Sequence, residues 1–187
     1  TVTVNEDATV TFVLTGSDID NDPLTFGLAG GDLSGNITGT VPTVTYSPAE
    51  NFNGEEKLLF FANDGELDSA IEVITINVLA VNDLPTVESQ TLFLAEDSSI
   101  ALTLKGHDID EDILTYLIED EPLHGTLTGA IPSLIYTPDE NYFGKDSFTF
   151  RLNDGSVSSE PGTVTLNISP NSDVPVAFSQ TVIGDED

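Results

Sequence analysis

The stretch Phe148-Thr149-Phe150-Arg151-Leu152, followed by Asn153-Asp154-Gly155, decides the fold class of this chain. Its apolar residues alternate with polar ones at a period of two, the pattern of a β-strand with one buried face. Asn-Asp-Gly then supplies the residues that a tight hairpin turn favours. A second alternating run follows at Val164-Thr165-Leu166-Asn167-Ile168. This part of the chain therefore predicts two strands separated by a turn.

The same reading extended along the chain predicts an all-β protein. The chain is rich in valine, isoleucine, threonine and phenylalanine, which favour strands, and Gly and Pro recur at regular intervals. No window shows an apolar stripe at helical spacing. About seven strands in roughly 90 residues are typical of an immunoglobulin-like sandwich. In the second half of the chain we predict strands at 91–94, 100–105, 114–118, 125–127, 134–136, 146–152 and 163–168.

A displacement of 90 residues aligns the chain with itself without a gap. Asn63-Asp64-Gly65 then lies over Asn153-Asp154-Gly155, and Tyr46 lies over Tyr136. Many spaced identities in one register indicate a tandem repeat. We therefore expect a first repeat at 1–81 with a truncated N-terminal edge, a linker at 82–85, a second repeat at 86–171, and at 172–187 a second linker with the start of a truncated third repeat.

The charge of the chain is strongly negative. Asp and Glu number 33 against 4 Lys and Arg, for a formal net charge of −29. Such a polyanion repels nucleic acid and anionic membranes, so we expect neither as a partner, and no apolar run is long enough for membrane insertion. Clustered carboxylates repel one another unless they are spread apart, protonated or bound to a cation. The alternative is a solvated acidic surface of the kind found in halophilic proteins.

Cysteine is absent, which excludes a disulfide scaffold, a zinc thiolate site and a thiol nucleophile. His107 and His124 align with serines in the first repeat, and neither belongs to a nucleophile motif. We therefore expect that the chain is not an enzyme. Tyr46 and Tyr136 are predicted to pack in the sandwich core; the alternative is stacking on sugar rings.

The order of motifs in each repeat resembles that of the bacterial cadherin-like repeats of large secreted adhesins. The motifs are an acidic pair, Asp-x-Asp-x-Asp, Tyr-x-Pro, Asn-Phe/Tyr-x-Gly, Asn-Asp-Gly and a closing Asn-Asp-x-Pro, and they cover nearly the whole chain. The resemblance implies two tandem immunoglobulin-like (cadherin-like) Greek-key β-sandwiches, and a secreted or bacterial cell-surface location.

The resemblance also implies calcium at the junction of the repeats. Carried over residue by residue, its ligands are Glu6, Asn82, Asp83, Asp108, Asp110 and Asp154. Further acids occupy ligand positions of junctions that lack one neighbouring repeat: Asp18, Asp20, Asp64, Glu96 and Asp173. The acid that opens the cadherin linker is Ala80 here, so fewer ions are expected than in vertebrate cadherins. Asp108-x-Asp110-x-Asp112 also matches the start of an EF-hand loop, but Ile113 stands where that loop requires glycine, and no helices flank it.

We therefore expect a calcium-binding structural or adhesive segment of a bacterial surface protein, in which Ca²⁺ stiffens the junction. Its partners would be the adjacent repeats of the same chain, with homophilic or polysaccharide contacts at the cell surface. The alternative function is a carbohydrate-binding module of a secreted bacterial protein.

Overall fold

A computed structural model describes residues 1–181. The predicted start of a third repeat at Gly184–Asp187 lies outside the described residues. The described chain contains β-strands and no helix, and so no helix that could cross a membrane. It divides into two compact units, Thr1–Asn82 (unit 1) and Asp83–Asp187 (unit 2), which are described separately below.

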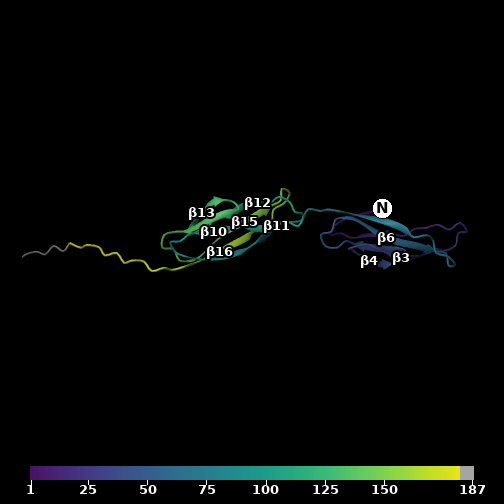
Figure 1. The fold of residues 1–187 in the computed structure, drawn as a ribbon, viewed down its shortest axis with the longest axis horizontal. Coiled ribbons are helices and arrows are strands. Elements are labelled where there is room, and N and C mark those ends of the chain that lie inside the picture. The colour runs from purple at the N-terminus through teal and green to yellow at the C-terminus, as the bar shows by residue number, and fades with distance from the viewer. Residues whose placement is uncertain (182–187) are drawn as a thin grey trace, which may run out of the picture. The chain divides into compact units, whose positions relative to one another are not determined.

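Unit 1 is a sandwich of two sheets (Figure 1). Its strands are β1 (Val2–Asn5), β2 (Val10–Val13), β3 (Thr25–Asp32), β4 (Asn36–Thr40), β5 (Thr43–Ser47), β6 (Gly54–Asn63) and β7 (Glu72–Leu79). One sheet has the order β1-β7-β6-β3 and the other β2-β5-β4. The β1–β7 pair is parallel, whereas the other pairs are antiparallel. The chain crosses between sheets after β1, β2, β3 and β5, which gives the Greek-key connection of an immunoglobulin-like sandwich.

Unit 2 repeats this topology and adds one strand pair. Its strands are β8 (Thr86–Glu88), β9 (Gln90–Ala95), β10 (Ile100–Thr103), β11 (Lys105–His107), β12 (Thr115–Asp120), β13 (Gly125–Ala130), β14 (Ser133–Pro138), β15 (Gly144–Asn153) and β16 (Gly162–Ser169). The two main sheets are β12-β15-β16-β9 and β10-β14-β13, and β8 pairs with β11 at the edge.

The alternating residues build the core of unit 2 as expected. Phe148, Phe150 and Leu152 of β15 are buried, and Val164 and Leu166 of β16 are fully inaccessible. Each of the seven strands predicted for this half is present.

Two details of unit 2 differ from the sequence prediction. The expected strand at 100–105 breaks at Leu104, whose N–H donates to the Pro132 carbonyl at 2.9 Å. The chain then leaves β14 and pairs as β11 with β8, a strand of three residues that the alternation did not indicate.

A buried tyrosine binds a buried carboxylate in each unit. Tyr136 Oη donates to Asp146 Oδ2 at 2.8 Å, and the N–H groups of Leu123 and His124 donate to the same carboxylate at 3.1 and 3.0 Å. In unit 1, Tyr46 Oη donates to Glu56. Both tyrosines are completely buried, which confirms the core-packing prediction.

The hydrogen bonds set the pKa of these carboxyl groups. Burial alone would raise the pKa of Asp146, but the hydrogen bonds from Tyr136, Ser147, His124 and Leu123 outweigh it and hold that pKa below its ordinary value. Burial and the neighbouring carboxylate raise the pKa of Tyr136, so its hydroxyl stays a donor at neutral pH. The pair therefore fixes the loop before β13 from inside the core.

Substituting Tyr136→Phe is expected to lower the free energy of unfolding of unit 2 by about 1–3 kcal/mol at neutral pH. Because the pKa of Asp146 is depressed in the folded state, its contribution is complete above about pH 4 and disappears as the pH falls through the folded pKa. The cost of the substitution should therefore shrink at about pH 2. Urea unfolding at both pH values measures it, with Tyr116→Phe as the control. An equal cost for both variants would contradict this role.

Candidate functional site

The backbone of the loop Asp108–Asp112 is held by hydrogen bonds to one of the loop's own carboxylates. Asp108 Oδ1 accepts the N–H groups of Asp110 at 2.9 Å and Asp112 at 3.4 Å, and Glu111 has a φ of +63°. The equivalent loop of unit 1 has the same form, with Asp18 Oδ1 accepting the N–H groups of Asp20 and Asp22. Asp-x-Asp-x-Asp is thus a turn in which one carboxylate oxygen holds the backbone.

Asp83 lies against this loop. Its N–H donates to Asp110 Oδ2 at 2.8 Å, and carboxylate oxygens of Asp83 and Asp110 lie within 4.8 Å of each other. Two unit charges about 4 Å apart repel by about 4 kcal/mol at an effective dielectric near 20. The backbone of unit 2 therefore holds two carboxylates at a distance that a shared cation would stabilise.

The second oxygen of Asp108 points to the same conclusion. Asp108 Oδ2 is buried and has no hydrogen-bond partner among the described residues. A buried carboxylate oxygen without a donor carries a desolvation cost that a metal ion would offset.

Asp154 follows β15, whose last residue Asn153 pairs with Thr115 at the start of β12, directly after the acidic loop. Asp154 is 9% exposed, and its Oδ1 accepts the N–H groups of Ser156 at 2.6 Å and Val157 at 2.7 Å. One oxygen thus shapes the turn, as Asp108 Oδ1 does in its own loop.

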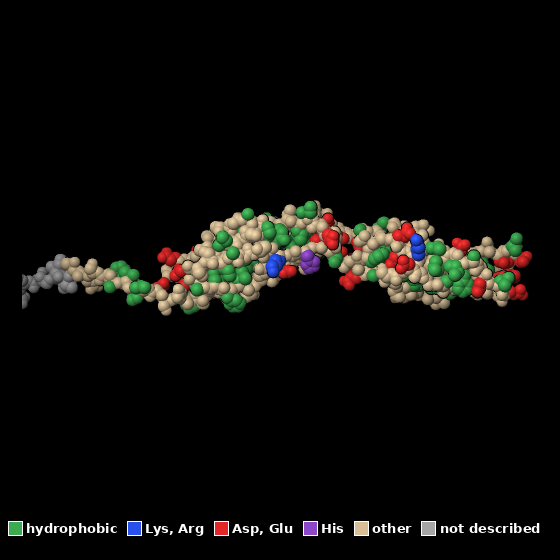
Figure 2. All heavy atoms as spheres, in the orientation of Figure 1, with side chains coloured by type: hydrophobic (Ala, Val, Ile, Leu, Met, Phe, Trp, Pro, Cys, Tyr) green, Lys and Arg blue, Asp and Glu red, His purple; other side chains and the backbone are tan. Residues whose placement is uncertain are grey.

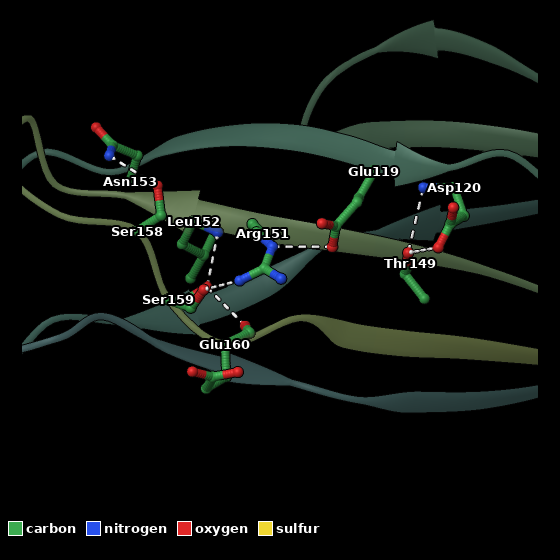
Figure 3. A network of polar contacts seen from close by, with 9 residues as sticks. All are labelled: Glu119, Asp120, Thr149, Arg151, Leu152, Asn153, Ser158, Ser159 and Glu160. Carbon is green, nitrogen blue, oxygen red and sulfur yellow. Dashed lines mark hydrogen bonds and ion pairs between the residues drawn. The ribbon is translucent and has the colours of Figure 1, made fainter.

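A polar network on β15 holds the segment that follows Asp154 (Figure 3). Arg151 donates through Nε to Glu119 at 2.8 Å and through a terminal nitrogen to the Ser159 carbonyl at 2.8 Å. Ser159 Oγ accepts the Leu152 N–H, and the Asn153 amide donates to the Val157 carbonyl. The loop that carries Asp154 is therefore fixed to the sheet at several points.

Glu6 and Glu96 are buried glutamates in equivalent positions. Glu6 is 2% exposed, and its Oε1 accepts the Val81 N–H at 2.5 Å inside unit 1. Glu96 is 4% exposed and accepts the Asn171 N–H in unit 2. Each glutamate binds the backbone just before a linker aspartate, Asp83 or Asp173. Asn82 and Asp173 themselves are exposed.

The remaining predicted acids of unit 1 lie in loops equivalent to those of Asp108 and Asp154 in unit 2. Asp18 and Asp64 line one cavity of about 150 Å³. The N–H groups of Leu67 and Glu66 hold the pKa of Asp64 below its ordinary value. Asp20 is exposed.

Oxygen is the only donor type that these residues offer, which fits a hard divalent cation. Ca²⁺ accepts six to eight oxygen ligands in flexible geometry, whereas Mg²⁺ demands a near-ideal octahedron. Asp83, Asp108, Asp110 and Asp154 supply carboxylates, and backbone N–H groups fix the orientations of those of Asp108, Asp110 and Asp154. The all-oxygen donor set and the orphaned Asp108 oxygen fit a hard cation such as calcium.

Cationic side chains cannot neutralise this chain. Two ion pairs are formed within residues 1–181, Lys57–Glu55 at 3.5 Å and Arg151–Glu119 at 2.8 Å. Figure 2 shows red acidic side chains over both units and few blue ones. His124 stacks on Tyr142 with ring centroids 4.1 Å apart, and His107 is exposed.

Comparison with known proteins places both units in one family. The model of the bacterial Ig domain family matches residues 1–77 and again residues 82–167. Integrin beta-like protein A of Dictyostelium discoideum is 24% identical over 216 residues, which covers 89% of this chain and 11% of that protein. Integrin beta-like protein E of the same organism is 28% identical, over 94% of this chain and 9% of that protein. The chain therefore spans about a tenth of the length of these curated relatives.

Solved structures with a similar fold include cadherin ectodomains. The human mucin-like protocadherin EC1-2 is 20% identical, with a TM-score of 0.53, over 91% of this chain and 95% of that one. Protocadherin gamma B2 extracellular domains 1-5 are 14% identical, with a TM-score of 0.51, over 91% of this chain and 42% of that one. Because the family model covers most of both units, the chain belongs to the bacterial Ig domain family, of which it carries two consecutive copies with a cadherin-like fold.

Proposed function

We propose that this chain is a calcium-binding structural and adhesive segment of a longer secreted or cell-surface protein. The observation that carries the proposal is the buried Asp108 Oδ2, which has no donor within residues 1–181. Asp108 lies in the same loop as Asp110, whose carboxylate oxygen lies within 4.8 Å of that of Asp83.

The proposed ligands come from two sides of the linker. Unit 2 supplies Asp83, Asp108, Asp110 and Asp154, as described above. Glu6 and Asn82 of unit 1 are proposed to complete the set. Glu6 binds the Val81 N–H, and Val81 is two residues from Asp83 in the chain, a span of at most about 7.6 Å between Cα atoms.

Calcium bound by both sets of ligands would stiffen the linker. Without the ion, the acids repel one another and the linker keeps its freedom. With the ion, the same oxygens become ligands of one centre, and the two repeats become a rod. Modules of this kind in extracellular proteins bind calcium at about 10⁻⁴ to 10⁻³ M. The function is mechanical and adhesive, with no catalytic step.

Thermal unfolding in calcium and in EDTA tests this function. At a free calcium concentration near 100 times the dissociation constant, one site adds about 2.7 kcal/mol of stability. For a domain of this size that corresponds to a rise in Tm of roughly 10 °C or more. Small-angle scattering on the same samples should report a longer particle in calcium. If magnesium, or sodium chloride at equal ionic strength, gave the same rise, the acids would be a screened surface and the proposal would be wrong.

A further inference from the structure

The three-stranded sheet of each unit carries no charge. Its strands are β2, β5 and β4 in unit 1 and β10, β14 and β13 in unit 2. None of these strands contains Asp, Glu, Lys or Arg, although 20% of the residues in the chain are charged. The many acids of this chain therefore lie outside these two sheets.

The outer face of the sheet in unit 2 is uncharged and partly apolar. Its exposed residues, read from the burial and register of the three strands, are Ala101, Thr103, Thr126, Thr128, Ala130, Ser133, Ile135 and Thr137. Ile135 is 44% exposed. Two further apolar residues are exposed in the segments that flank β13, Leu123 by 83% and Ile131 by 43%. This side of unit 2 is therefore distinct from the acidic loops.

Strand β13 forms an open edge of this sheet (Figure 1). It is the last strand in the order β10-β14-β13, and in the described chain it pairs with β14 alone. Its register is unbroken from Gly125 to Ala130. Strand β4 holds the same place in unit 1 and pairs with β5 alone. Because both units leave this edge unpaired, the open edge is a property of the repeat, and its N–H and C=O groups can pair with another chain.

The neighbouring edge of the four-stranded sheet is protected in both units. In unit 2 this edge is β12, which has a bulge between Ile118 and Asp120 and carries the acids Glu119 and Asp120. In unit 1 it is β3, with a bulge at the same place and an acid at Asp32. Bulges and charged side chains prevent sheet edges from pairing with other molecules. Strand β13 has neither.

We propose that β13 of one copy of this chain pairs antiparallel, edge to edge, with β13 of a second copy. The pairing would join the two three-stranded sheets into one continuous sheet about a two-fold axis. With that axis perpendicular to the sheet, the outer faces of both copies lie on one side. Thr126 and Thr128 of one copy then lie beside the same residues of the other.

Charge favours a second copy as the occupant. Two chains of net charge −29 repel one another, and like charges placed directly opposite across a strand pair are destabilising. A two-fold contact places a patch against itself, so in this chain the patch must be free of acids. A cationic partner would instead be attracted to acidic loops such as Asp108–Asp112. The uncharged edge thus fits a partner that carries the same negative charge as the chain itself.

Several differences favour β13 over β4 as the edge that pairs. Strand β13 has 6 residues and β4 has 5. Leu33 and Val41, which flank β4, are half-buried, whereas their counterparts Leu123 and Ile131 are exposed. Thr45 of β5 stands where β14 has Ile135. The edge in unit 2 therefore offers more apolar surface that a second copy would cover.

The contact is expected to be weak. A strand of this length spans about 20 Å, so the pair buries less than the roughly 800 Å² per partner of a stable complex. We expect dissociation in the range of about 10 to 500 µM. The contact goes beyond the calcium-binding function and requires no calcium, so a chain that fails to bind calcium would leave it untouched.

Sedimentation velocity of the full chain in EDTA tests the proposal. Between about 1 and 500 µM the average mass should rise towards that of two chains and no further, since a two-fold contact is closed. Thr128→Glu should abolish the rise, because it places like charges beside each other in the pair. Thr38→Glu adds the same charge at the equivalent exposed position of β4 and should associate like the parent chain.

Salt separates this contact from one made by ion pairs. Raising sodium chloride from about 0.1 to 1 M shortens the Debye length from about 10 to 3 Å and screens the repulsion between the copies. The dimer should therefore become more stable in high salt. A dimer that dissociates in high salt would be held by ion pairs and would contradict the proposal.

Cross-linking locates the contact, because the chain has no cysteine of its own. Thr126→Cys, Thr128→Cys and an equimolar mixture of the two are oxidised separately. Residues opposite each other in an antiparallel pair have Cβ atoms about 4.5–5.5 Å apart, close to disulfide reach, so at least one sample should form a linked dimer. Thr38→Cys should stay monomeric. A parent chain that is monomeric at every concentration, undiminished association of Thr128→Glu, or equal cross-linking of Thr38→Cys would overturn the proposal.

Discussion

Asp110→Asn is expected to abolish the calcium-dependent rise in Tm while leaving the chain folded. The substitution is isosteric and keeps an oxygen to accept the Asp83 N–H. It removes the negative charge that a calcium ion needs and relieves repulsion with Asp83 in the absence of the ion. The variant should therefore be at least as stable as the parent in EDTA, and less stable by about 2.7 kcal/mol at calcium near 100 times the parent's dissociation constant.

Asp139→Asn is the matched control, because it removes one exposed negative charge from the same unit, away from the acidic loop. It should keep the full calcium response, which differential scanning calorimetry can measure for all three proteins. Equal loss in both variants would show that calcium acts through net charge, and an undiminished response of Asp110→Asn would remove this residue from the site.

Phe150→Ala is expected to destabilise unit 2 by about 3–5 kcal/mol, whereas Phe60→Ala should cost unit 1 less than about half of that. Phe150 is completely buried in a core cluster against which Val87 packs, whereas Phe60 is only half-buried. Urea unfolding followed by circular dichroism measures both costs.

The surface substitution Phe93→Ala provides the baseline for this comparison, because Phe93 is 74% exposed on β9. It should change stability by no more than about 0.5 kcal/mol. Equal costs at Phe60 and Phe150 would contradict the difference in burial between the two rings.

The alternation of apolar residues was sufficient to predict the sandwich. Phe148, Phe150 and Leu152 point inward because a strand with one buried face imposes that period, and the 90-residue displacement carries the prediction to unit 1. The sequence did not predict strand β8, because the strand is only three residues long and forms by pairing with β11. Such pairing leaves no pattern in the local sequence.

The local sequence pattern also could not predict polar contacts between residues that are far apart in the chain. Asp146 was read as the start of a strand, and its bond to Tyr136 depends on the approach of two strands in the fold. One signal in the sequence could have indicated this buried acid. Both repeats have an acid at the same position, Glu56 and Asp146, where the alternation of the strand places an inward-facing residue. Arg151 and Glu119 are also far apart in sequence, and unit 1 has Phe61 and Ala29 in their places.

The acidic site was predictable in part. The motifs Asp-x-Asp-x-Asp and Asn-Asp-x-Pro predicted Asp108, Asp110 and Asp83 as site residues. The structure brings Asp83 against Asp110. The sequence could not indicate that Asp108 binds its own loop with one oxygen and leaves the other buried without a donor. Calcium binding itself, and the roles of Glu6, Asn82 and Asp154 in it, stay predictions.

Isothermal titration of calcium into the chain, after removal of metal with EDTA and dialysis, tests the central claim most directly. The account predicts saturable binding with a dissociation constant of about 10⁻⁴ to 10⁻³ M. The principal site should be lost in Asp110→Asn and retained in Asp139→Asn. A featureless titration of the parent chain, or identical binding curves for the two variants, would contradict a calcium site at Asp83, Asp108 and Asp110.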